Sequence, residues 1–522
     1  MARIARIIEI PSIGALDRSA GNLSRQLAQA LRDAVRKGDV KPGDALPSTR
    51  LLAASLRIAR GTVVDAYEQL IAEGFLESRG GADTRVAHAL AEPRPGGEPP
   101  RAARRRETSA ARSSLPQPAA AYARIAREFA PLPPVPFAIS VPVGATAPDD
   151  AWRRLGNRLR AKGAAAPTGY ADPQGAPPLR EAIADYVRKS RSVRCEPGQV
   201  IVTSGTQQGL YLACQVLLGA HDRAWVENPA YRGITAILEC TGRGDAMVRV
   251  PVDADGIDVD AGIRLAHDAR AAFVTPSHQY PLGMPMSMAR RSALLAWARA
   301  GDAWVIEDDY DSELRYEGYP FPSLQGLDPE RVVYLGTFSK MLFPSLRLGY
   351  LIVPSDLVAA FCGARVLMDR HAPTADQYVL AAFMAEGHFD RHIRRVRGVY
   401  ADHRAQLMDT LGRLLPGDLA WLQPGDQGMH AVLWLAAGID DLQVTAMAAR
   451  AGVAVRAVSP MFAPGTARPG LVLGFGGFSR EQMDAAAQRL AEVIASVGGA
   501  ASCDRSKPAG VADDVDAAER RK

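Results

Sequence analysis

A stretch rich in proline, arginine and alanine divides the chain into two unequal parts. Ten prolines fall between Pro93 and Pro136, and so many prolines prevent a continuous helix or strand ladder. The stretch also has few apolar side chains to bury, so we expect an extended linker there. The predicted organisation is a small domain over residues 20–88, a linker over 89–136, a large domain over 137–497 and a disordered tail over 498–522.

Composition excludes several classes of protein. The chain has 522 residues, of which 47% are hydrophobic and 23% charged, as in a folded protein of two or three domains. No apolar run approaches the roughly 20 residues that cross a bilayer. Glu9 and Pro11 interrupt the N-terminal apolar stretch, so neither a secretory signal nor a membrane partner is expected. The five cysteines lack CxxC spacing, which predicts no metal site, no disulfide framework and a cytoplasmic location.

Positive charge is concentrated at the N-terminal end of the chain. Residues 1–112 contain 19 Lys and Arg against 13 Asp and Glu, whereas the whole chain has a net charge of +5. An anionic partner for this part of the chain is therefore expected. A solvated surface beside a basic linker is the alternative explanation of the same charge.

The small domain has the sequence pattern of a helix-turn-helix. Apolar residues recur every four positions from Leu23 to Val35, which predicts a helix over 22–37. Ser48 is a typical residue to precede a second helix, because its hydroxyl can accept a hydrogen bond from a free backbone N–H. A third helix is predicted over 61–74, after a short turn.

The segment after the third helix alternates like a β-hairpin around Gly80 and Gly81, which predicts a winged helix-turn-helix with a recognition helix that begins at Arg60. The sequence GDVKPGDALPSTRLLAASLRIARGTVVDAYEQLIAEGFLESRGG resembles the GntR-type winged helix, and the resemblance covers nearly all of the small domain. It implies binding to double-stranded DNA. A surface salt bridge for Arg50 and a helix-start role for Thr62 are the alternative interpretations. The residues that would contact DNA are Arg50, Arg60, Thr62, Gly80 and Gly81.

The large domain alternates between helical segments and short apolar segments rich in β-branched residues. This alternation predicts an α/β fold with a mostly parallel sheet. Polar residues gather at the ends of the apolar segments, where open α/β sheets bind ligands. The segments are QVIVT, RAWVENP, AAFVTPS, DAWVIEDDY, RVVYLGTFSK and LGYLIVP.

Four of these ends together favour a site for pyridoxal 5′-phosphate (PLP). The motif SGTQQG opens a helix whose backbone N–H groups, together with Thr206, would bind a phosphate. Asp308 and Tyr310 end a buried strand, and GTFSK supplies two hydroxyls and Lys340, with Arg347 soon after. PLP needs a lysine for a Schiff base and an aspartate for its ring nitrogen. Taken alone, each motif has an ordinary alternative, such as a surface lysine or a helix cap.

The large domain resembles the fold-type-I aminotransferases over most of its length, in motifs that include GYADPQGAPPLREAIADY, TSGTQQGLYL, ENPAYRG, TPSHQYPLG, EDDYDSELRY and GTFSKMLFPSLRLGY. The resemblance implies that Lys340 carries PLP as an internal aldimine, that Asp308 pairs with the ring nitrogen, and that Tyr310 bonds the ring hydroxyl. Tyr231 would stack on the ring, and Tyr170 would reach the phosphate of a neighbouring subunit, which implies a homodimer. The cofactor-binding residues are then Tyr170, Gly205, Thr206, Gln207, Tyr231, Asp308, Tyr310, Thr337, Ser339, Lys340 and Arg347.

Two positions depart from the aminotransferase pattern. Tyr280 stands where an asparagine usually bonds the ring hydroxyl, and Val472 stands where many aminotransferases place the arginine that grips the substrate carboxylate. Losing such a charge-assisted contact removes about 1.5–3 kcal/mol of binding, so efficient transamination is not expected. Possible substitutes for this arginine are Arg232, Arg456 and Arg468, and the sequence does not distinguish among the three.

The two domains in this order resemble the MocR/GabR-type transcriptional regulators. The resemblance implies a PLP-dependent, DNA-binding regulator that works as a domain-exchanged homodimer. It would sense an amine, an amino acid or PLP itself through the aldimine at Lys340. A PLP-dependent aminotransferase with an accessory DNA-binding domain is the main alternative, so enzymatic activity is left open. A PLP-binding relic without an effector is the third interpretation.

Overall fold

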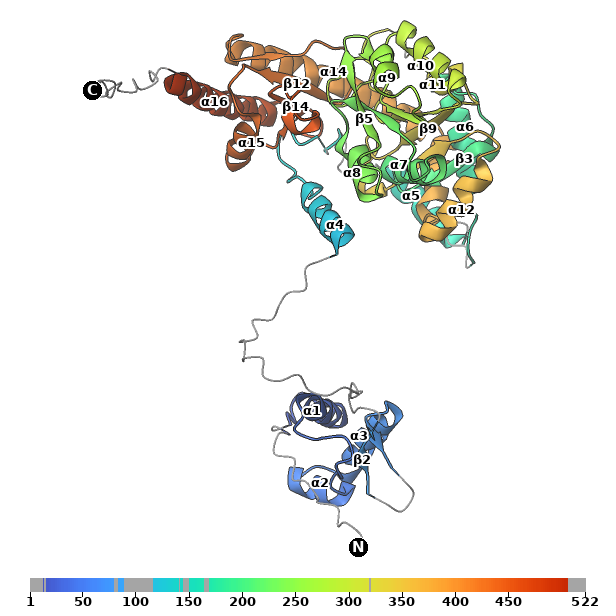
Figure 1. The fold of residues 1–522 in the computed structure, drawn as a ribbon, viewed down its shortest axis with the longest axis vertical. Helices are drawn as coiled ribbons and strands as arrows, with labels where there is room; N and C mark the ends of the chain where they lie inside the picture. Colours follow the sequence, from blue (N-terminus) through green and yellow to red (C-terminus); the bar gives the residue numbers. More distant parts are fainter. Residues whose placement is uncertain are drawn as a thin grey trace, which may run out of the picture. The chain divides into compact units, whose positions relative to one another are not determined.

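The computed structural model describes residues 13, 16–78, 83–88, 116–139, 141–143, 150–163, 169–318 and 321–505. The chain forms two compact units, Met1–Arg112 and Ser113–Lys522 (Figure 1). The boundary between them falls within the proline-rich stretch. Within the described ranges, no helix is long and apolar enough to cross a membrane.

The small unit is a winged helix-turn-helix, as predicted. Local sequence sets its helix ends, because Gly38 adopts φ 81° after the first helix and the Ser48 hydroxyl accepts a hydrogen bond from the Leu51 N–H at 3.3 Å. The Tyr67 hydroxyl donates to the Pro47 carbonyl oxygen at 2.9 Å and so ties the third helix to the turn before the second. The elements are α1 (Leu23–Lys37), α2 (Thr49–Leu56), α3 (Arg60–Ala72) and the antiparallel strands β1 (Leu76–Glu77) and β2 (Arg85–Val86).

The prediction of an extended linker over 89–136 is wrong in its second half. Gln117–Glu128 form helix α4, with Pro116 and Pro118 at its N-terminus, where no helical hydrogen bond is lost. No proline occurs between Pro118 and Pro131, and alanine, the strongest helix former, is abundant there. In residues 116–136 the prolines therefore lie at the two ends, and the centre is free to form a helix.

The core of the large unit is a mostly parallel sheet, as predicted, in the order β3-β10-β9-β8-β7-β4-β5-β6. All six segments expected as strands are strands. β10 pairs antiparallel with β3 and β9, and β6 pairs antiparallel with β5, whereas the other strand pairs are parallel. The strands are β3 (Val200–Thr203), β4 (Ala224–Asn228), β5 (Met247–Asp253), β6 (Gly256–Ile257), β7 (Ala271–Val274), β8 (Trp304–Asp309), β9 (Val332–Thr337) and β10 (Gly349–Ile352).

Helices cover both faces of this sheet. One face packs against α7, α8 and α12 through side chains such as Leu210, Ile234 and Phe361. The other face packs against helices that include α6 and α10. The helices around the sheet are α5 (Asp150–Ala161), α6 (Pro177–Arg191), α7 (Thr206–Leu217), α8 (Arg232–Cys240), α9 (Val259–Ala266), α10 (Met288–Ala300), α11 (Leu324–Leu327), α12 (Val358–Asp369) and α13 (Ala375–Ala385).

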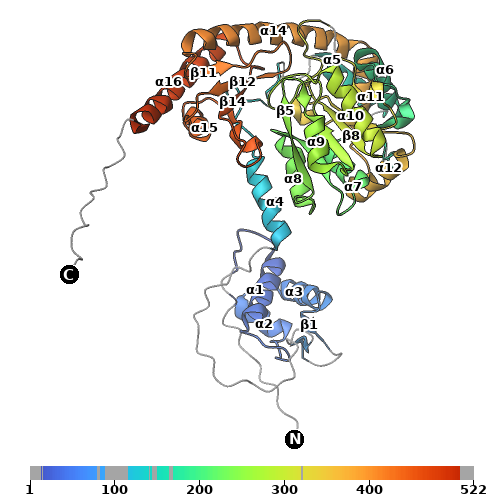
Figure 2. The same ribbon diagram turned by 45° about the horizontal axis from the view of Figure 1, so that its top comes forward.

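A smaller antiparallel sheet follows in the order β11-β12-β14-β13. The long helix α14 runs past the large sheet to reach it (Figure 2). The predicted tail begins too early, because the last helix continues beyond residue 498. The elements are α14 (His388–Leu414), β11 (Ala420–Leu422), β12 (His430–Leu435), α15 (Asp441–Arg450), β13 (Arg456–Ala457), β14 (Gly470–Gly474) and α16 (Arg480–Arg505).

Candidate functional site

A cavity of about 180 Å³ lies at the carboxyl ends of β8 and β9, beside the N-terminus of α7. The structure thus brings together residues that are far apart in the sequence but were predicted to share a site. The cavity is lined by Phe129, Leu132, Ile139, Thr206, Tyr231, Thr275, Tyr280, Asp308, Tyr310, Lys340, Met429 and Arg456.

Lys340 and Asp308 supply the charged groups of the predicted site. Burial lowers the pKa of Lys340, which favours the neutral, nucleophilic amine. The Asp308 side chain is buried, and its Oδ1 has no hydrogen-bond partner among the described residues. Burial, assisted by the Asp309 carboxylate, raises the pKa of Asp308 to about 7, while Lys340 opposes the shift. A buried carboxylate without a partner is a suitable site for a cationic group such as a protonated ring nitrogen.

A phosphate-sized cradle lies at the start of α7. Gly205 precedes the helix with φ 86°, and a Cβ at this position would lie 3.2 Å from Nη2 of Arg347. Only glycine combines this backbone conformation with the close approach of the guanidinium. The Arg347 Nη2 donates to the Ser204 carbonyl oxygen at 2.8 Å. The free N–H groups of α7 and the arginine together attract an anion.

Two hydroxyls near the cradle differ in their hydrogen bonding. The Thr337 Oγ1 accepts from the Ser339 N–H at 3.1 Å and is within 3.5 Å of the Leu348 carbonyl oxygen. The Ser339 Oγ is buried and has no hydrogen-bond partner in the described part of the chain. Ser339 therefore has a free donor for a phosphate, whereas Thr337 mainly shapes the turn.

Gln207 lies behind Tyr231 and does not line the cavity. Its Oε1 accepts from the Tyr231 hydroxyl at 3.1 Å, and its Nε2 donates to the Gly233 carbonyl oxygen at 3.2 Å. These bonds fix the tyrosine ring at the cavity wall. The side chain of Gln207 thus positions Tyr231, and its predicted contact with the cofactor stays a prediction.

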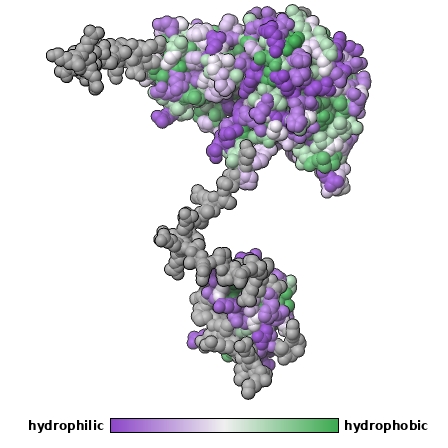
Figure 3. All heavy atoms as spheres, in the orientation of Figure 1, coloured by the Kyte–Doolittle hydropathy of each residue, from purple (hydrophilic) through white to green (hydrophobic). Residues whose placement is uncertain are grey.

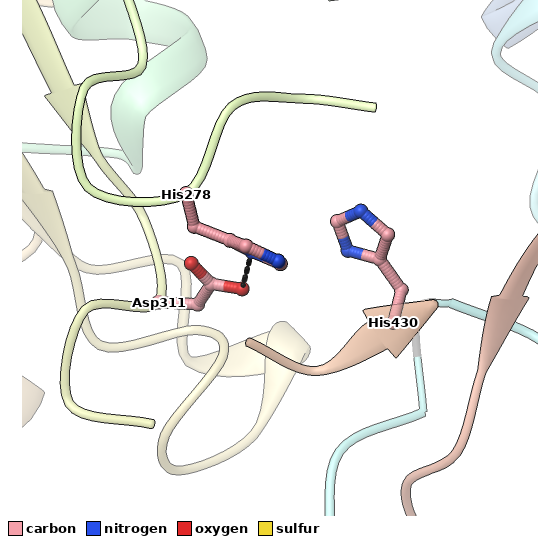
Figure 4. Close-up of side chains that lie close together, drawn as sticks. All are labelled: His278, Asp311 and His430. Carbon is pink, nitrogen blue, oxygen red and sulfur yellow. Dashed lines mark hydrogen bonds and ion pairs between the residues drawn. The ribbon is translucent and has the colours of Figure 1, made fainter. Parts of the chain in front are cut away.

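A buried polar cluster supports Tyr310. Figure 4 shows three side chains of this cluster, His278, Asp311 and His430. The Tyr310 hydroxyl donates to the His278 carbonyl oxygen at 3.0 Å and lies 3.0 Å from His278 Nδ1. The Asp311 Oδ2 lies 2.9 Å from the same Nδ1 and also accepts from the Met429 N–H at 3.2 Å. His430 stands on the other side of the cluster, where its Nε2 lies 2.9 Å from the Pro281 carbonyl oxygen.

Two histidines and one carboxylate within 4.8 Å of one another are also a possible set of metal ligands. The absence of a metal site stays a prediction. The existing hydrogen bonds of the cluster already suffice to hold Tyr310 in place.

The three arginines considered as substitutes for the carboxylate-binding arginine have different surroundings. Arg232 is paired with Glu128 and Glu239, both at 2.8 Å. Arg468 lies over the Trp434 ring, 4.4 Å from its centroid. Arg456 lines the cavity, and its Nε is buried without a hydrogen-bond partner among the described residues.

Several cavity residues escaped the sequence predictions. Tyr280, noted only as a departure, packs edge-to-face on Tyr231 with ring centroids 5.7 Å apart. Phe129 and Leu132 were hidden because they lie in the stretch predicted to be an extended linker. Only the apolar character of these two residues, within a stretch expected to be extended, could have suggested that they contact the large domain.

Tyr170 lies on the surface, with 80% of its area exposed. The Arg370 guanidinium stacks over its ring at 4.3 Å. It does not line the cavity of its own chain.

The predicted DNA-contacting side chains that the structure describes lie at the surface of the small unit. Arg50 and Arg60 are exposed and Thr62 is half-buried. Arg50 has no ion pair within the described ranges, and Arg60 Nε donates to Thr49 Oγ1 at 3.4 Å. The wing residues Gly80 and Gly81 lie outside the described residues.

Comparisons with known proteins agree with this geometry. Residues 136–490 match the family described as aminotransferase class I and II, and residues 23–86 match bacterial regulatory proteins of the gntR family. The chain is 36% identical over 462 residues to the HTH-type pyridoxine biosynthesis transcriptional regulator PdxR of Corynebacterium glutamicum, which covers 88% of this chain and 94% of that protein. It is 37% identical over 475 residues to the probable rhizopine catabolism regulatory protein MocR of Rhizobium meliloti, with 90% and 93% covered.

The large unit is also similar to solved aminotransferases. LysN, an α-aminoadipate aminotransferase from Thermus thermophilus complexed with N-(5′-phosphopyridoxyl)-L-leucine, has a TM-score of 0.64 and 28% identity, over 70% of this chain and 93% of that one. The free Asp308 carboxylate, the free Ser339 hydroxyl and the glycine cradle fit the ring nitrogen and phosphate of the same cofactor.

Fold and site thus define a DNA-binding protein with an aminotransferase-like domain. The chain belongs to the MocR/GabR-type transcriptional regulators, in which a GntR-type winged helix precedes a class I and II aminotransferase domain. Its cofactor is PLP.

Asp308 makes the stability of the cofactor-free protein depend on pH. Its raised pKa means that the native state still holds a proton that the unfolded chain releases near pH 4, so the free energy of unfolding should fall as pH rises from about 4 to about 7. Asp308→Asn removes this contribution and should flatten the pH dependence. Urea denaturation of both proteins between about pH 5 and pH 8 measures the difference. Glu227, whose pKa burial also raises to about 7, is present in both. Equal slopes would contradict the raised pKa.

Proposed function

We propose that this regulator senses a small amine, an amino acid or PLP at the cavity, through a covalent bond between PLP and Lys340. The observation that carries this proposal is that Phe129 and Leu132, from the segment that leads to the DNA-binding unit, line the same cavity as Lys340. A ligand in the cavity would contact the connection between the two units.

The residue roles follow from the geometry around Lys340. PLP supplies a reactive aldehyde and an electron-withdrawing ring when bound. Asp308 would hold the ring nitrogen by charge, Tyr310 the ring hydroxyl and Tyr231 one face of the ring. Gly205, Thr206, Ser339 and Arg347 would hold the phosphate, with Thr337 shaping their turn and Gln207 fixing Tyr231.

Ion pairs join helix α4 to helix α8. Glu128 accepts from Arg232 at 2.8 Å, and Arg124 lies 3.5 Å from Glu239 on α8. Such partly exposed pairs are each worth about 0–1 kcal/mol, so they hold the helix only weakly. Occupation of the cavity would shift the population between two placements of α4, and with it the geometry available to the DNA-binding units.

An apolar surface supports a homodimer. Val366, Leu367 and Met368 at the end of α12 are exposed by 43%, 89% and 40%, close in the sequence to Arg370, which stacks on Tyr170. Figure 3 shows an apolar area where Figure 1 places α12. Gln208, in the first turns of α7, donates to Met368 Sδ and Asp369 Oδ2. A second copy of the chain on this surface would cover Leu367 and bring its own Tyr170 near the phosphate cradle at the start of α7. Exchange of the DNA-binding units across such a dimer is part of the proposal.

An aminotransferase with an accessory DNA-binding domain is the second candidate, favoured by the complete set of residues around Lys340. It predicts turnover with a keto acid as amino acceptor. The valine at position 472 weakens it, because the usual arginine for the substrate carboxylate is missing there.

Lys340→Ala tests the covalent role of the lysine. The variant should lose the visible absorbance of bound PLP and keep its fold, since only one side chain at the cavity wall is shortened. Absorbance spectra and sedimentation measure both properties, with Lys189→Ala, an exposed lysine on α6, as the control. A visible band that persists in the Lys340 variant would mean that another group binds the aldehyde.

Arg60→Ala tests the DNA-contacting helix. DNA binding should weaken by about 1–3 kcal/mol if the arginine contacts a base, with relaxed sequence preference. If it contacts a phosphate, the affinity should fall equally for all DNA sequences. The slope of log affinity against log salt concentration should then decrease in magnitude by about 1. Fluorescence anisotropy at two salt concentrations measures this, with Arg25→Ala on α1 as the control. Unchanged affinity would remove Arg60 from the interface.

Leu367→Asp tests the dimer surface. A charge at the centre of a buried apolar contact should weaken association at least tenfold. Sedimentation over a range of concentrations measures association, and Leu442→Asp, on an exposed leucine of α15, is the control. A variant that dimerises as tightly as the unmodified protein would place the interface elsewhere.

A further inference from the structure

Glu227 is a buried carboxylate that lies near the cavity but does not line it. It is the fourth residue of β4 and is 4% exposed. Its oxygens accept hydrogen bonds from Thr275 and Gln279, and no cation forms an ion pair with it in the described part of the chain. Burial raises the pKa of Glu227 to about 7, and the bonds oppose this rise because they favour the ionised form. Burying a carboxylate is costly without such partners, so Glu227 restricts where these donors lie.

All three donors come from the segment that follows β7. Glu227 Oε1 accepts from the Thr275 N–H at 3.2 Å, and its Oε2 accepts from Thr275 Oγ1 at 2.7 Å. The Gln279 Nε2 donates to the same Oε2 at 3.1 Å. An ionised carboxylate accepts at both oxygens, whereas a glutamine amide would present its own N–H groups to one set of donors. The three bonds together therefore require a carboxylate at this position.

Thr275 and Gln279 in turn hold the backbone of Tyr280, which lines the cavity. The Tyr280 N–H donates to Thr275 Oγ1 at 3.0 Å, and Gln279 Nε2 donates to the Tyr280 carbonyl oxygen at 2.9 Å. The Gln279 Oε1 accepts from the Leu282 N–H at 3.0 Å and closes the turn. Each partner of Glu227 thus fixes one side of the Tyr280 backbone.

The same amide also reaches the segment that carries Tyr231. Gln279 Nε2 lies 3.0 Å from the Pro229 carbonyl oxygen, so its two N–H groups are shared among Glu227, Pro229 and Tyr280. Pro229 lies midway along the chain between Glu227 and Tyr231. The rings of Tyr231 and Tyr280 pack edge-to-face with centroids 5.7 Å apart. Glu227 is therefore connected to one tyrosine along the chain and to the other through hydrogen bonds.

We propose that Glu227 is a positioning residue for the cofactor, which fixes Tyr280 against Tyr231. The two tyrosines then keep the cavity in the shape that binds the PLP ring. This rests on the proposed function, because the ring must lie beside Tyr231. Glu227 acts through Tyr280, so its replacement should lower the affinity for PLP by an amount that depends on the Tyr280 ring.

The experiment measures the affinity for PLP, which is titrated into the full-length, PLP-depleted protein and followed by its visible absorbance. Glu227→Gln should bind PLP about tenfold more weakly, as for loss of one hydrogen bond to a charged group. Glu227→Asp keeps the charge and should lie between this variant and the unmodified protein. Glu307→Gln is the control, because Glu307 is fully buried and accepts from the Leu324 and Gln325 N–H groups, outside the cavity lining. It should lower the melting temperature and leave the affinity for PLP unchanged.

A double-mutant cycle separates a positioning role from a direct electrostatic one. Glu227 and Asp308 both line a small cavity of about 20 Å³, and the charge of Glu227 contributes to the raised pKa of Asp308. If Glu227 acts through Tyr280, Glu227→Gln should change the affinity by less than about twofold in a Tyr280→Ala background. An effect through the charge of Asp308 would persist in that background and would overturn the proposal.

The other failures separate the two proposals. An unchanged affinity of Glu227→Gln, or an equal loss in Glu307→Gln, overturns the role of Glu227 while the PLP-dependent regulator stands. If thermal melting shows that Glu227→Gln does not fold, Glu227→Asp is carried through the same cycle, with an expected loss of about threefold. If the unmodified protein shows no visible absorbance that depends on Lys340, the proposed function itself fails.

Discussion

The pairing of β8 with β9 is the constraint on which the site depends. These parallel strands are in register from Val305 opposite Val332 to Asp309 opposite Gly336, so both carboxyl ends lie at one edge of the sheet. Asp308 is the penultimate residue of β8, and Lys340 follows β9 by three residues. The adjacent Asp309 accepts from Arg191 at 2.7 Å and from the Tyr334 hydroxyl at 2.5 Å, both buried. This anchor fixes the end of β8 and leaves Asp308 free for the cofactor.

Burial of this edge of the large sheet also shifts the pKa values of Asp308 and Lys340. Removal from water raises the pKa of Asp308 and lowers the pKa of Lys340, so the two groups bear less charge before the cofactor binds than they would in water. A cationic ring nitrogen at Asp308 and a covalent bond at Lys340, as proposed, would relieve both costs. The pocket is thus prepared for PLP by burial, while Tyr280 and Val472 remove two contacts that an efficient aminotransferase would use.

Much of this arrangement could be predicted from the sequence because it is local. The glycine before α7, the Asp308–Tyr310 strand end and the lysine after β9 each lie in a short motif whose conformation follows from its own residues. The winged helix was predictable for the same reason, with Ser48 as the start of α2. What the sequence could not give is contact between distant segments. The positions of Phe129 and Leu132 at the cavity, and the different surroundings of the three candidate arginines, depend on how segments distant in the sequence pack together.

If the cofactor pocket controls DNA binding, as proposed, removal of PLP must change how the protein binds DNA. The most direct measurement is the affinity of the PLP-loaded protein for the DNA upstream of its own gene, compared with the PLP-depleted protein at two salt concentrations. We expect tight, salt-sensitive and sequence-selective binding whose affinity or geometry changes when PLP is removed. Identical binding by both forms, or no selective binding by either, would contradict it.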